Sequence, residues 1–460
     1  MTTVDLTRPT RIHVVGVGGA GMSAVAEVLH SAGHRVSGSD RAPSAVVDRL
    51  ERLGLDVHVG HDPEAVRHAQ LLTASTAVGP DDPEVAAAVA LGIPVLRRAE
   101  ILSALCGLRR TAAVSGTHGK TTTTALLGAA LGGGGRRPSW IVGAELRGLG
   151  SGARWDDGEW LVVEADESDG TMVELPVQVA VLTSVEPDHL EHYGDFDALV
   201  AAFERFLTGA TELAVVCVDD PVAAELAGRV VGRGAGLVTY GTSSSAEYRM
   251  AEVTTSRATT AFTLEHRGLA MGTVEVPMAG WHNARNAAAA VVVATLLGVP
   301  LEMAAAGVAV APAVARRFEV RAVAGGVTFV DDYAHLPGEV AAVLDTARRG
   351  GWERIVGVFQ PHRFSRTEAL WEALGRSLGG VDALWVTDVY GAGEAPRPGI
   401  TGELVARAAR RTHPGLPVRY QPDRHTLVAE LREELRDGDL CLVMGAGDLT
   451  DLFGQLATRP

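Results

Sequence analysis

The stretch that decides the fold class is Ser115-Gly116-Thr117-His118-Gly119-Lys120-Thr121-Thr122. It joins an apolar run at 111–115, which we expect to be a strand, to a predicted helix at 121–131 that the glycines 132–135 end. Free amides at a helix start favour an anion, and glycine lets the backbone approach phosphate oxygens closely. The stretch therefore predicts a phosphate-binding loop, although Val114 stands where the usual pattern has glycine.

Lys120 is the only lysine of the chain, because every other position counted as Lys or Arg is arginine. An ammonium group is a compact point charge, whereas a guanidinium group is a planar fork, so the two are not interchangeable at a phosphate. We interpret Lys120 as the cation for the terminal phosphates of ATP. The next hydroxyl, that of Thr121, is predicted to bind Mg²⁺.

Two further motifs follow apolar runs that we expect to be buried strands. Glu164 ends the run 160–163, and a neighbouring strand of a phosphate-loop fold supplies an acid that holds Mg²⁺, so Glu164 is predicted as a metal ligand. His189 follows the run 179–182 and is a candidate ligand for a second Mg²⁺. A single histidine in a loop is also typical of an ordinary surface residue.

A second glycine-rich segment lies near the start of the chain, between a predicted strand at 12–15 and a predicted helix at 23–32. Its residues are Gly16, Gly18, Gly19, Ala20, Gly21, Met22 and Ser23, and Asp40 follows after about one further strand. The spacing is typical of a site for the diphosphate of NAD or of another nucleotide, with the acid on the ribose. A glycine-rich tight turn is the structural alternative.

Polar residues also gather at a helix start and at two strand ends nearer the carboxyl terminus. His282, Asn283 and Asn286 open an apolar helix, where they read an adenine edge or simply cap the helix. The segments 331–335 and 360–366 follow two predicted strands, the place where open α/β sheets bind ligands. Two arginines and one histidine of these segments form either a carboxylate site or a surface ion-pair network.

Composition restricts the class of protein further. Strands and helices alternate along 460 residues, which predicts an α/β fold of about three domains. The net charge of −15 argues against general binding of nucleic acid or anionic membrane. Three widely separated cysteines favour neither a disulfide framework nor a zinc site, and we see no signal peptide or membrane span, so a cytoplasmic protein is expected.

Taken together, the motifs resemble the Mur ligase family along nearly the whole chain. GVGGAGMS, GTHGKTTTT, EADESD, EPDHL, HNARNAAAA, RRFE, DDYAH, QPHRFSRT, DVYGAGEAPRPG and MGAGD occur in the order of that family. The resemblance implies a Rossmann-like UDP-sugar domain at 1–108, a central phosphate-loop ATPase-type domain at 109–312 and a Rossmann-like amino-acid domain at 313–460. The first glycine segment is then better interpreted as a UDP diphosphate site.

The resemblance also implies roles for single residues. Lys120, Glu164, His189 and Arg317 would be catalytic; Thr121, Glu164 and His189 would bind Mg²⁺; His282, Asn283, Asn286, Arg317 and Asp332 would contact ATP; and Tyr333, His335, Arg363 and Arg366 would line the amino-acid site. Leu336, Gly338 and Trp281 depart from the family pattern. These departures concern the amino-acid pocket and the surroundings of the adenine.

The implied activity is an ATP- and Mg²⁺-dependent ligation of L-alanine to UDP-N-acetylmuramate through an acyl phosphate, in peptidoglycan precursor synthesis, by a monomer or weak homodimer. One alternative is a ligase that attaches a whole peptide to the same sugar nucleotide. Another class, an NAD-dependent oxidoreductase, explains the first glycine segment but leaves Lys120 and its loop unused. A phosphate-loop switch protein leaves the histidine and arginine motifs after residue 313 unexplained.

Overall fold

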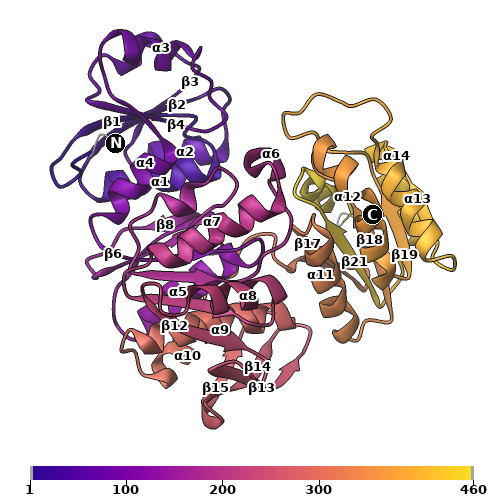
Figure 1. Ribbon diagram of the computed structural model, residues 1–460. Coiled ribbons are helices and arrows are strands. Elements are labelled where there is room, and N and C mark those ends of the chain that lie inside the picture. Colours follow the sequence, from indigo (N-terminus) through magenta and orange to yellow (C-terminus); the bar gives the residue numbers. More distant parts are fainter. Residues whose placement is uncertain (1–3, 457–460) are drawn as a thin grey trace. The chain divides into compact units, whose positions relative to one another are not determined.

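A computed structural model describes residues 4–456, which form two compact units. The first unit runs to Glu252 and also holds Phe262–Glu275 and Arg285–Val314; the second holds Val253–Ala261, Val276–Ala284 and the chain from Ala315 onward. Three sheets, one within each predicted domain, confirm the α/β fold class (Figure 1). The exact domain boundaries stay a prediction. Among the described residues, no helix combines the length and apolar character that a membrane crossing requires.

The first sheet has the strand order β3-β2-β1-β4-β5, with parallel neighbours throughout. Its strands are β1 (Arg11–Val15), β2 (Arg35–Asp40), β3 (Asp56–Val59), β4 (Leu71–Ala74) and β5 (Val95–Arg97), and its helices are α1 (Ala20–Ser31), α2 (Ala45–Arg52), α3 (Pro83–Ala90) and α4 (Arg98–Cys106). Alternate residues of β1 point to opposite faces. Ile12 and Val14 join the core that contains α1, whereas Val15 joins the smaller core beneath α3.

The second sheet has ten strands, in the order β15-β14-β13-β12-β11-β10-β6-β9-β7-β8. They are β6 (Arg110–Ser115), β7 (Ser139–Leu146), β8 (Ser151–Arg154), β9 (Trp160–Glu164), β10 (Val179–Leu182), β11 (Leu213–Cys217), β12 (Gly236–Gly241), β13 (Tyr248–Thr255), β14 (Thr260–His266) and β15 (Leu269–Val276). The helices are α5 (Lys120–Gly133), α6 (Leu190–Tyr193), α7 (Phe196–Gly209), α8 (Pro221–Val230), α9 (Trp281–Leu296) and α10 (Leu301–Ala309). Strand β6, which carries the phosphate loop, lies between β10 and β9 and is parallel to both.

The third sheet, drawn from orange to yellow in Figure 1, has the order β16-β17-β21-β18-β19-β20. Its strands are β16 (Glu319–Ala324), β17 (Val327–Asp332), β18 (Arg354–Phe359), β19 (Ala383–Val386), β20 (Val418–Tyr420) and β21 (Asp439–Met444), and its helices are α11 (Pro337–Arg349), α12 (Phe364–Ser377), α13 (Gly402–Thr412), α14 (Arg424–Glu434) and α15 (Leu452–Leu456). Leu440 and Leu442 of β21 share a core with α11, α12 and α13, whereas Cys441 and Val443 share one with α14 and α15. Helices on both faces define a doubly wound sheet.

The glycine stretch 132–135 ends α5 as predicted, but the helix ends at Gly133, two residues later than expected. The helix continues through Gly132 and Gly133 because it crosses α10 at close range. A Cβ at Gly133 would lie 2.2 Å from the Met303 carbonyl oxygen, and one at Gly307 would lie 2.2 Å from the Ala129 carbonyl oxygen. The two glycines allow the helix backbones to touch, so they serve the packing of α5 on α10.

Gly307→Ala is therefore expected to destabilise the protein by about 1–3 kcal/mol, because the added methyl overlaps backbone that cannot move aside. Gly132→Ala is the matched control, since a Cβ there meets nothing within 4 Å, and alanine should stabilise the helix by about 0.5–1 kcal/mol. Thermal unfolding of both variants measures the difference. Equal melting temperatures would contradict the close crossing.

Candidate active site

The phosphate loop between β6 and α5 is held by the segment that follows β10. The amide of Thr117 donates to the Ser184 carbonyl (2.9 Å), and the amide of His118 donates to Ser184 Oγ (3.0 Å). Thr117 Oγ1 accepts from the amide of Glu186 (2.8 Å). These bonds fix the loop backbone, as pre-organised binding of an anion requires.

The two loop glycines allow approaches that no other residue permits. Gly116 has a φ of +131°, and a Cβ there would lie 2.2 Å from Thr183 Oγ1 and 2.9 Å from the Ser184 backbone. Gly119 has a φ of +81°, and a Cβ there would lie 2.4 Å from Asn286 Oδ1. Asn286 of α9 thus lies against the loop, so the structure brings together two motifs that are far apart in the sequence.

The Lys120 side chain folds back over its own loop. Its Nζ donates to the carbonyl of Gly116 (2.7 Å) and lies 2.7 Å from Glu167 Oε1. Burial by itself lowers the pKa of Lys120, but the charges of Glu167 and Asp166 outweigh burial and raise that pKa. The ammonium group is therefore a permanent cation at the position where a terminal phosphate would bind.

Glu167 is a site residue that was not predicted from the sequence, where only Glu164 of this acidic segment was assigned a role. Its side chain is only 2% exposed, and burial raises its pKa to about 7 despite the nearby Lys120 charge. Its carbonyl oxygen also accepts a hydrogen bond from Tyr193 Oη (2.6 Å). A solitary lysine at the start of a buried helix requires a counter-charge, and this requirement was the signal for such an acid.

The predicted metal ligands Thr121 and Glu164 lie side by side. Thr121 Oγ1 donates to Glu164 Oε1 (3.1 Å), and Glu164 Oε2 accepts from the amide of Gly143 (2.7 Å). A hydroxyl beside a carboxylate is an all-oxygen donor set, which suits Mg²⁺. His189 caps the start of α6 and has a φ of +54°. Its ring nitrogens lie 3.2 Å from Asp188 Oδ2 and 3.6 Å from Glu191 Oε1. Its role as a metal ligand stays a prediction.

In the first sheet, the glycine segment and Asp40 are in direct contact. The amides of Gly16 and Val17 donate to the Ser39 carbonyl (2.8 and 2.9 Å), and the amide of Gly18 donates to Asp40 Oδ2 (2.8 Å). A Cβ at Gly18 would lie 2.7 Å from the same carboxylate oxygen, so a larger residue there would displace the Asp40 side chain. The structure thus brings the glycine segment and Asp40 together, while binding of a diphosphate stays a prediction.

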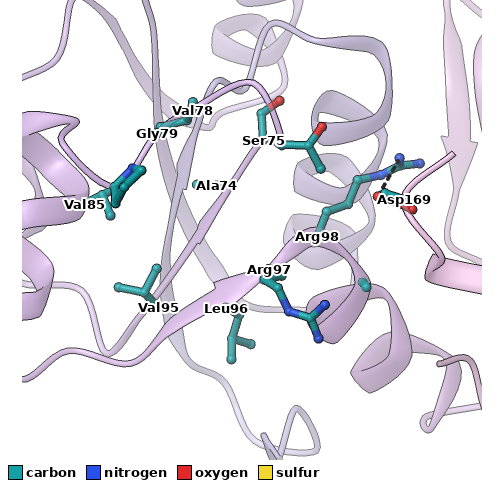
Figure 2. A pocket seen from close by; sticks show the side chains of 13 residues that line it. Ala74, Ser75, Val78, Gly79, Val85, Val95, Leu96, Arg97, Arg98 and Asp169 are labelled. Carbon is teal, nitrogen blue, oxygen red and sulfur yellow. Dashed lines mark ion pairs between the residues drawn. The ribbon is translucent and has the colours of Figure 1, made fainter. Parts of the chain in front are cut away.

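A cavity of about 360 Å³ adjoins this glycine segment (Figure 2). Ser75 lies in its lining, and a Cβ at Gly16 would lie 2.9 Å from Ser75 Cβ. Figure 2 shows Arg98 extended toward Asp169. The Arg98 guanidinium lies 4.0 Å from the Asp169 carboxylate and 3.7 Å from the Asp166 carboxylate. Arg98 was not predicted as a site residue, because one arginine at the start of a helix carries no distinctive sequence signal.

In the third sheet, both carboxylate oxygens of Asp332 accept hydrogen bonds from backbone amides of nearby residues. Oδ2 accepts from the amide of Phe318 (2.7 Å) and Oδ1 from the amide of Ala334 (2.8 Å). Burial raises the pKa of Asp332 to about 6. This carboxylate thus positions the segment that carries Arg317, whose guanidinium carbon lies 5.3 Å from the centre of the Tyr333 ring. A direct contact of Asp332 with ATP stays a prediction.

Most of the residues predicted for the amino-acid site surround His362. This histidine belongs to the quoted motif QPHRFSRT, but it was not predicted as a site residue. The His362 ring lies 5.5 Å from the His335 ring and stacks on Tyr390 at 5.7 Å, and its Nδ1 lies 3.1 Å from Arg366 Nη1. Tyr333 adds an edge contact to His335 at 5.3 Å. The strand ends thus bring cations and aromatic rings together, as a site for a small carboxylate requires.

Burial, together with the nearby His335 and Arg366, lowers the pKa of His362 to about 3. The unfolded imidazole takes up a proton below about pH 6.5, whereas the folded one does so only near pH 3, so this residue makes folding less favourable as the pH falls between these values. His362→Gln should reduce the pH dependence of stability by at most about 1.4 kcal/mol per pH unit. Melting temperatures between pH 7 and pH 5 test this, with the exposed His425→Gln as the control. Parallel curves for wild type and His362→Gln would contradict it.

His282 and Asn283 lie at the start of α9. Asn283 Nδ2 donates to the Ala279 carbonyl (2.8 Å), which is the arrangement of a helix-start residue, and His282 Nδ1 lies 3.5 Å from Thr346 Oγ1. Trp281, a departure from the family pattern, lies beneath the Arg349 guanidinium at 5.7 Å. The proposed adenine contacts of these residues stay predictions.

Comparison with known proteins matches three family models in chain order. They are described as Mur ligase family, catalytic domain (residues 11–110), Mur ligase middle domain (114–294) and Mur ligase, glutamate ligase domain (316–447). The chain is 41% identical over 448 residues to a UDP-N-acetylmuramate–L-alanine ligase of Rhizobium meliloti (95% of this chain, 94% of the relative) and 42% identical over 456 residues to the enzyme of that name from Myxococcus xanthus (98% and 96%). The crystal structure of UDP-N-acetylmuramate-alanine ligase from Thermotoga maritima matches with a TM-score of 0.81 and 27% identity, covering 97% of this chain and 98% of that one.

The central sheet and its lysine-bearing loop place the chain among the phosphate-loop nucleotide-binding proteins. The matches along its length specify this class further: the chain belongs to the Mur ligase family.

Proposed function

We propose that the protein joins L-alanine to the lactyl carboxylate of UDP-N-acetylmuramate and converts ATP to ADP and phosphate, a step in the synthesis of peptidoglycan precursors. The observation that carries this proposal is the phosphate loop, with Lys120 and the Thr121–Glu164 pair, in a chain 41% identical to an enzyme of that activity. We further propose that the protein is cytoplasmic, which suits its use of ATP and its three free, buried cysteines. Its proposed oligomeric state is a monomer or weak homodimer.

The reaction balances in two steps. A carboxylate oxygen of the sugar nucleotide attacks the γ-phosphorus of ATP, which gives an acyl phosphate and ADP. The neutral amine of alanine then attacks the acyl carbon, loses a proton and displaces inorganic phosphate, which leaves the amide. The acyl phosphate is destroyed by water, so the site must exclude water during the interval.

Lys120 and the loop amides would offset the charge that gathers on the transferred phosphoryl group. Thr121 and Glu164, with His189, would hold Mg²⁺, which supplies further charge neutralisation when bound. Gly18 and Asp40, with the cavity at Arg98, would receive the sugar nucleotide, and Arg366, with His335, would receive the carboxylate of alanine. Arg317 would contact ATP from the third domain.

The test is a phosphate-release assay with ATP, Mg²⁺, UDP-N-acetylmuramate and L-alanine, in which each component is omitted in turn. Release should require all four, and a panel of amino acids should show L-alanine as the preferred acceptor. Phosphate release without either acceptor would indicate a plain ATPase. A preference for a tripeptide over L-alanine would indicate the peptide-adding reaction, and binding of NADH, followed by fluorescence, would favour an oxidoreductase.

A further inference from the structure

A group of polar side chains lies on the α3 face of the first sheet, where the surrounding core is apolar. This histidine–carboxylate cluster consists of His13 of β1, Ser39 of β2, His58 of β3, His61 of the following loop, Asp82 at the start of α3, and Glu84 in its first turn. The Glu84 side chain is 0% exposed. A buried carboxylate requires compensation by charge or by hydrogen bonds, so the cluster is costly unless each member has a partner.

Both Glu84 oxygens face nitrogen atoms. Oε1 lies 3.1 Å from His58 Nε2 and accepts from the amide of Asp62 (3.0 Å). Oε2 lies 3.3 Å from His61 Nδ1, and it also accepts from Ser39 Oγ. Glu84 is thus held in one position by several elements of the sheet.

Three of these atoms lie at the spacing of metal ligands. His61 Nδ1 lies 3.4 Å from Asp82 Oδ2 and 3.3 Å from Glu84 Oε2, and all three atoms lie within 4.8 Å of one another. Ligands about 2.0–2.1 Å from a tetrahedral Zn²⁺ lie roughly 3.3–3.4 Å apart, which is the spacing of the two pairs that include His61. The other oxygen of Asp82 caps α3 by accepting from the Glu84 amide (3.0 Å), so Oδ2 is directed toward His61.

His13 supplies an independent observation. Its side chain is completely buried, and its Nε2 has no hydrogen-bond partner although it lies 3.4 Å from Glu84 Oε2. Its Nδ1 lies 2.8 Å from Ser37 Oγ, and a serine hydroxyl can either accept from this nitrogen or donate to it. When Nδ1 is the donor, Nε2 carries a lone pair, and metal-binding histidines typically hydrogen-bond through the second ring nitrogen in this way. In that tautomer a cation at Glu84 Oε2 would give Nε2 a partner.

We propose that His61, Asp82 and Glu84 bind one divalent transition-metal ion of the Zn²⁺ class, with His13 beside it. The imidazole nitrogen excludes a preference for Mg²⁺, which favours oxygen ligands. The site is separate from the phosphate loop, and it does not depend on the proposed ligase activity.

The position of the cluster indicates a structural role for the ion. The Ser39 hydroxyl donates a hydrogen bond to Glu84, and the Ser39 carbonyl oxygen accepts from the amides of Gly16 and Val17. The loop after β3 is also tied to β2, because the amide of Gly60 donates to the Asp40 carbonyl (2.8 Å). A metal that joins His61 to α3 would therefore stabilise the glycine segment through β2.

The experiment titrates metal-free protein with Zn²⁺ by calorimetry in excess Mg²⁺, which saturates sites that are made of oxygen ligands. His61→Ala is the main variant, because its side chain is 18% exposed and can be removed without leaving a sealed cavity. Glu84→Gln is the second variant, and His30→Ala, a histidine of α1 in the same domain, is the matched control. Cobalt substitution adds a visible absorption band that reports tetrahedral coordination.

Wild type and His30→Ala should bind one equivalent of Zn²⁺, with a higher melting temperature in its presence. His61→Ala should bind at least about tenfold more weakly and show no rise in melting temperature. Equal zinc affinity in wild type and His61→Ala would overturn the proposal, as would the absence of zinc binding, and the cluster would then be an ion-pair network only. If Glu84→Gln does not fold, His61→Ala still decides the question.

Discussion

Lys120→Arg is expected to lower kcat by about 10³-fold or more while the protein stays folded. The Lys120 ammonium lies within 2.7 Å of both the Gly116 carbonyl and Glu167 Oε1, inside a loop with no room for a planar fork. A guanidinium keeps the charge but places it farther along a longer side chain, so the transferred phosphoryl group loses its point of neutralisation. Phosphate release under saturating substrates measures the effect.

An exchange between the same two residue types at an exposed position provides the control for this variant. Arg267→Lys exchanges the same two groups at a side chain that is 75% exposed, and its activity should equal that of wild type. Melting temperatures of both variants should stay close to that of the parent, because Glu167 keeps a cationic partner in each. Full activity of Lys120→Arg would remove the phosphate role that we assign to this residue.

Loss of the hydroxyl–carboxylate pair should have the next largest effect. Thr121→Val and Glu164→Gln are each expected to lower kcat/KM by about 10²–10³-fold and to raise the Mg²⁺ concentration required for half-maximal rate. Thr121→Ser keeps the hydroxyl that donates to Glu164 Oε1 and should retain most of the activity. Mg²⁺ titrations of the phosphate-release rate distinguish a weakened metal site from a general loss of activity.

Glu159→Gln is the control for the carboxylate, because Glu159 precedes the same strand and its side chain is 54% exposed beside Arg110. Its Mg²⁺ dependence should match that of wild type. If Glu164→Gln also shows an unchanged Mg²⁺ dependence, Glu164 is not a metal ligand, and the pair with Thr121 serves only to position the loop.

The sequence predicted those parts of the fold whose signals are local. The apolar run at 179–182 became β10 at the predicted residues, since a buried parallel strand needs a continuous apolar segment. The strands β13, β14 and β15 were not predicted, because they are half-buried and contain no continuous apolar run like those of the buried parallel strands. Helix α5 runs past its predicted end to Gly133, which lies against α10, about 170 residues away along the chain.

The site residues divide in the same way, into those with a local sequence signal and those without one. Thr121, Glu164, Gly18 and Asp40 were predicted as site residues from their motifs and from the rule that ligands gather at the carboxyl ends of parallel strands. The structure places Thr121 beside Glu164 and Gly18 beside Asp40, and their roles in binding stay predictions. Glu167 and His362 were not predicted, because their importance comes from burial beside another charged or aromatic group. Burial of this kind is a property of the assembled sheet, and no single motif encodes it.

The solitary lysine makes the phosphate loop accessible to isotope chemistry. Growth on lysine labelled with ¹⁵N in its side chain places the isotope only on lysine Nζ atoms, and in this chain of 460 residues Lys120 carries the only one. A spectrum of the labelled protein should therefore contain a single lysine resonance, which comes from the loop. The loop resonance reports directly on the surroundings of the Gly116 carbonyl and Glu167, free of the overlap that lysine-rich enzymes show.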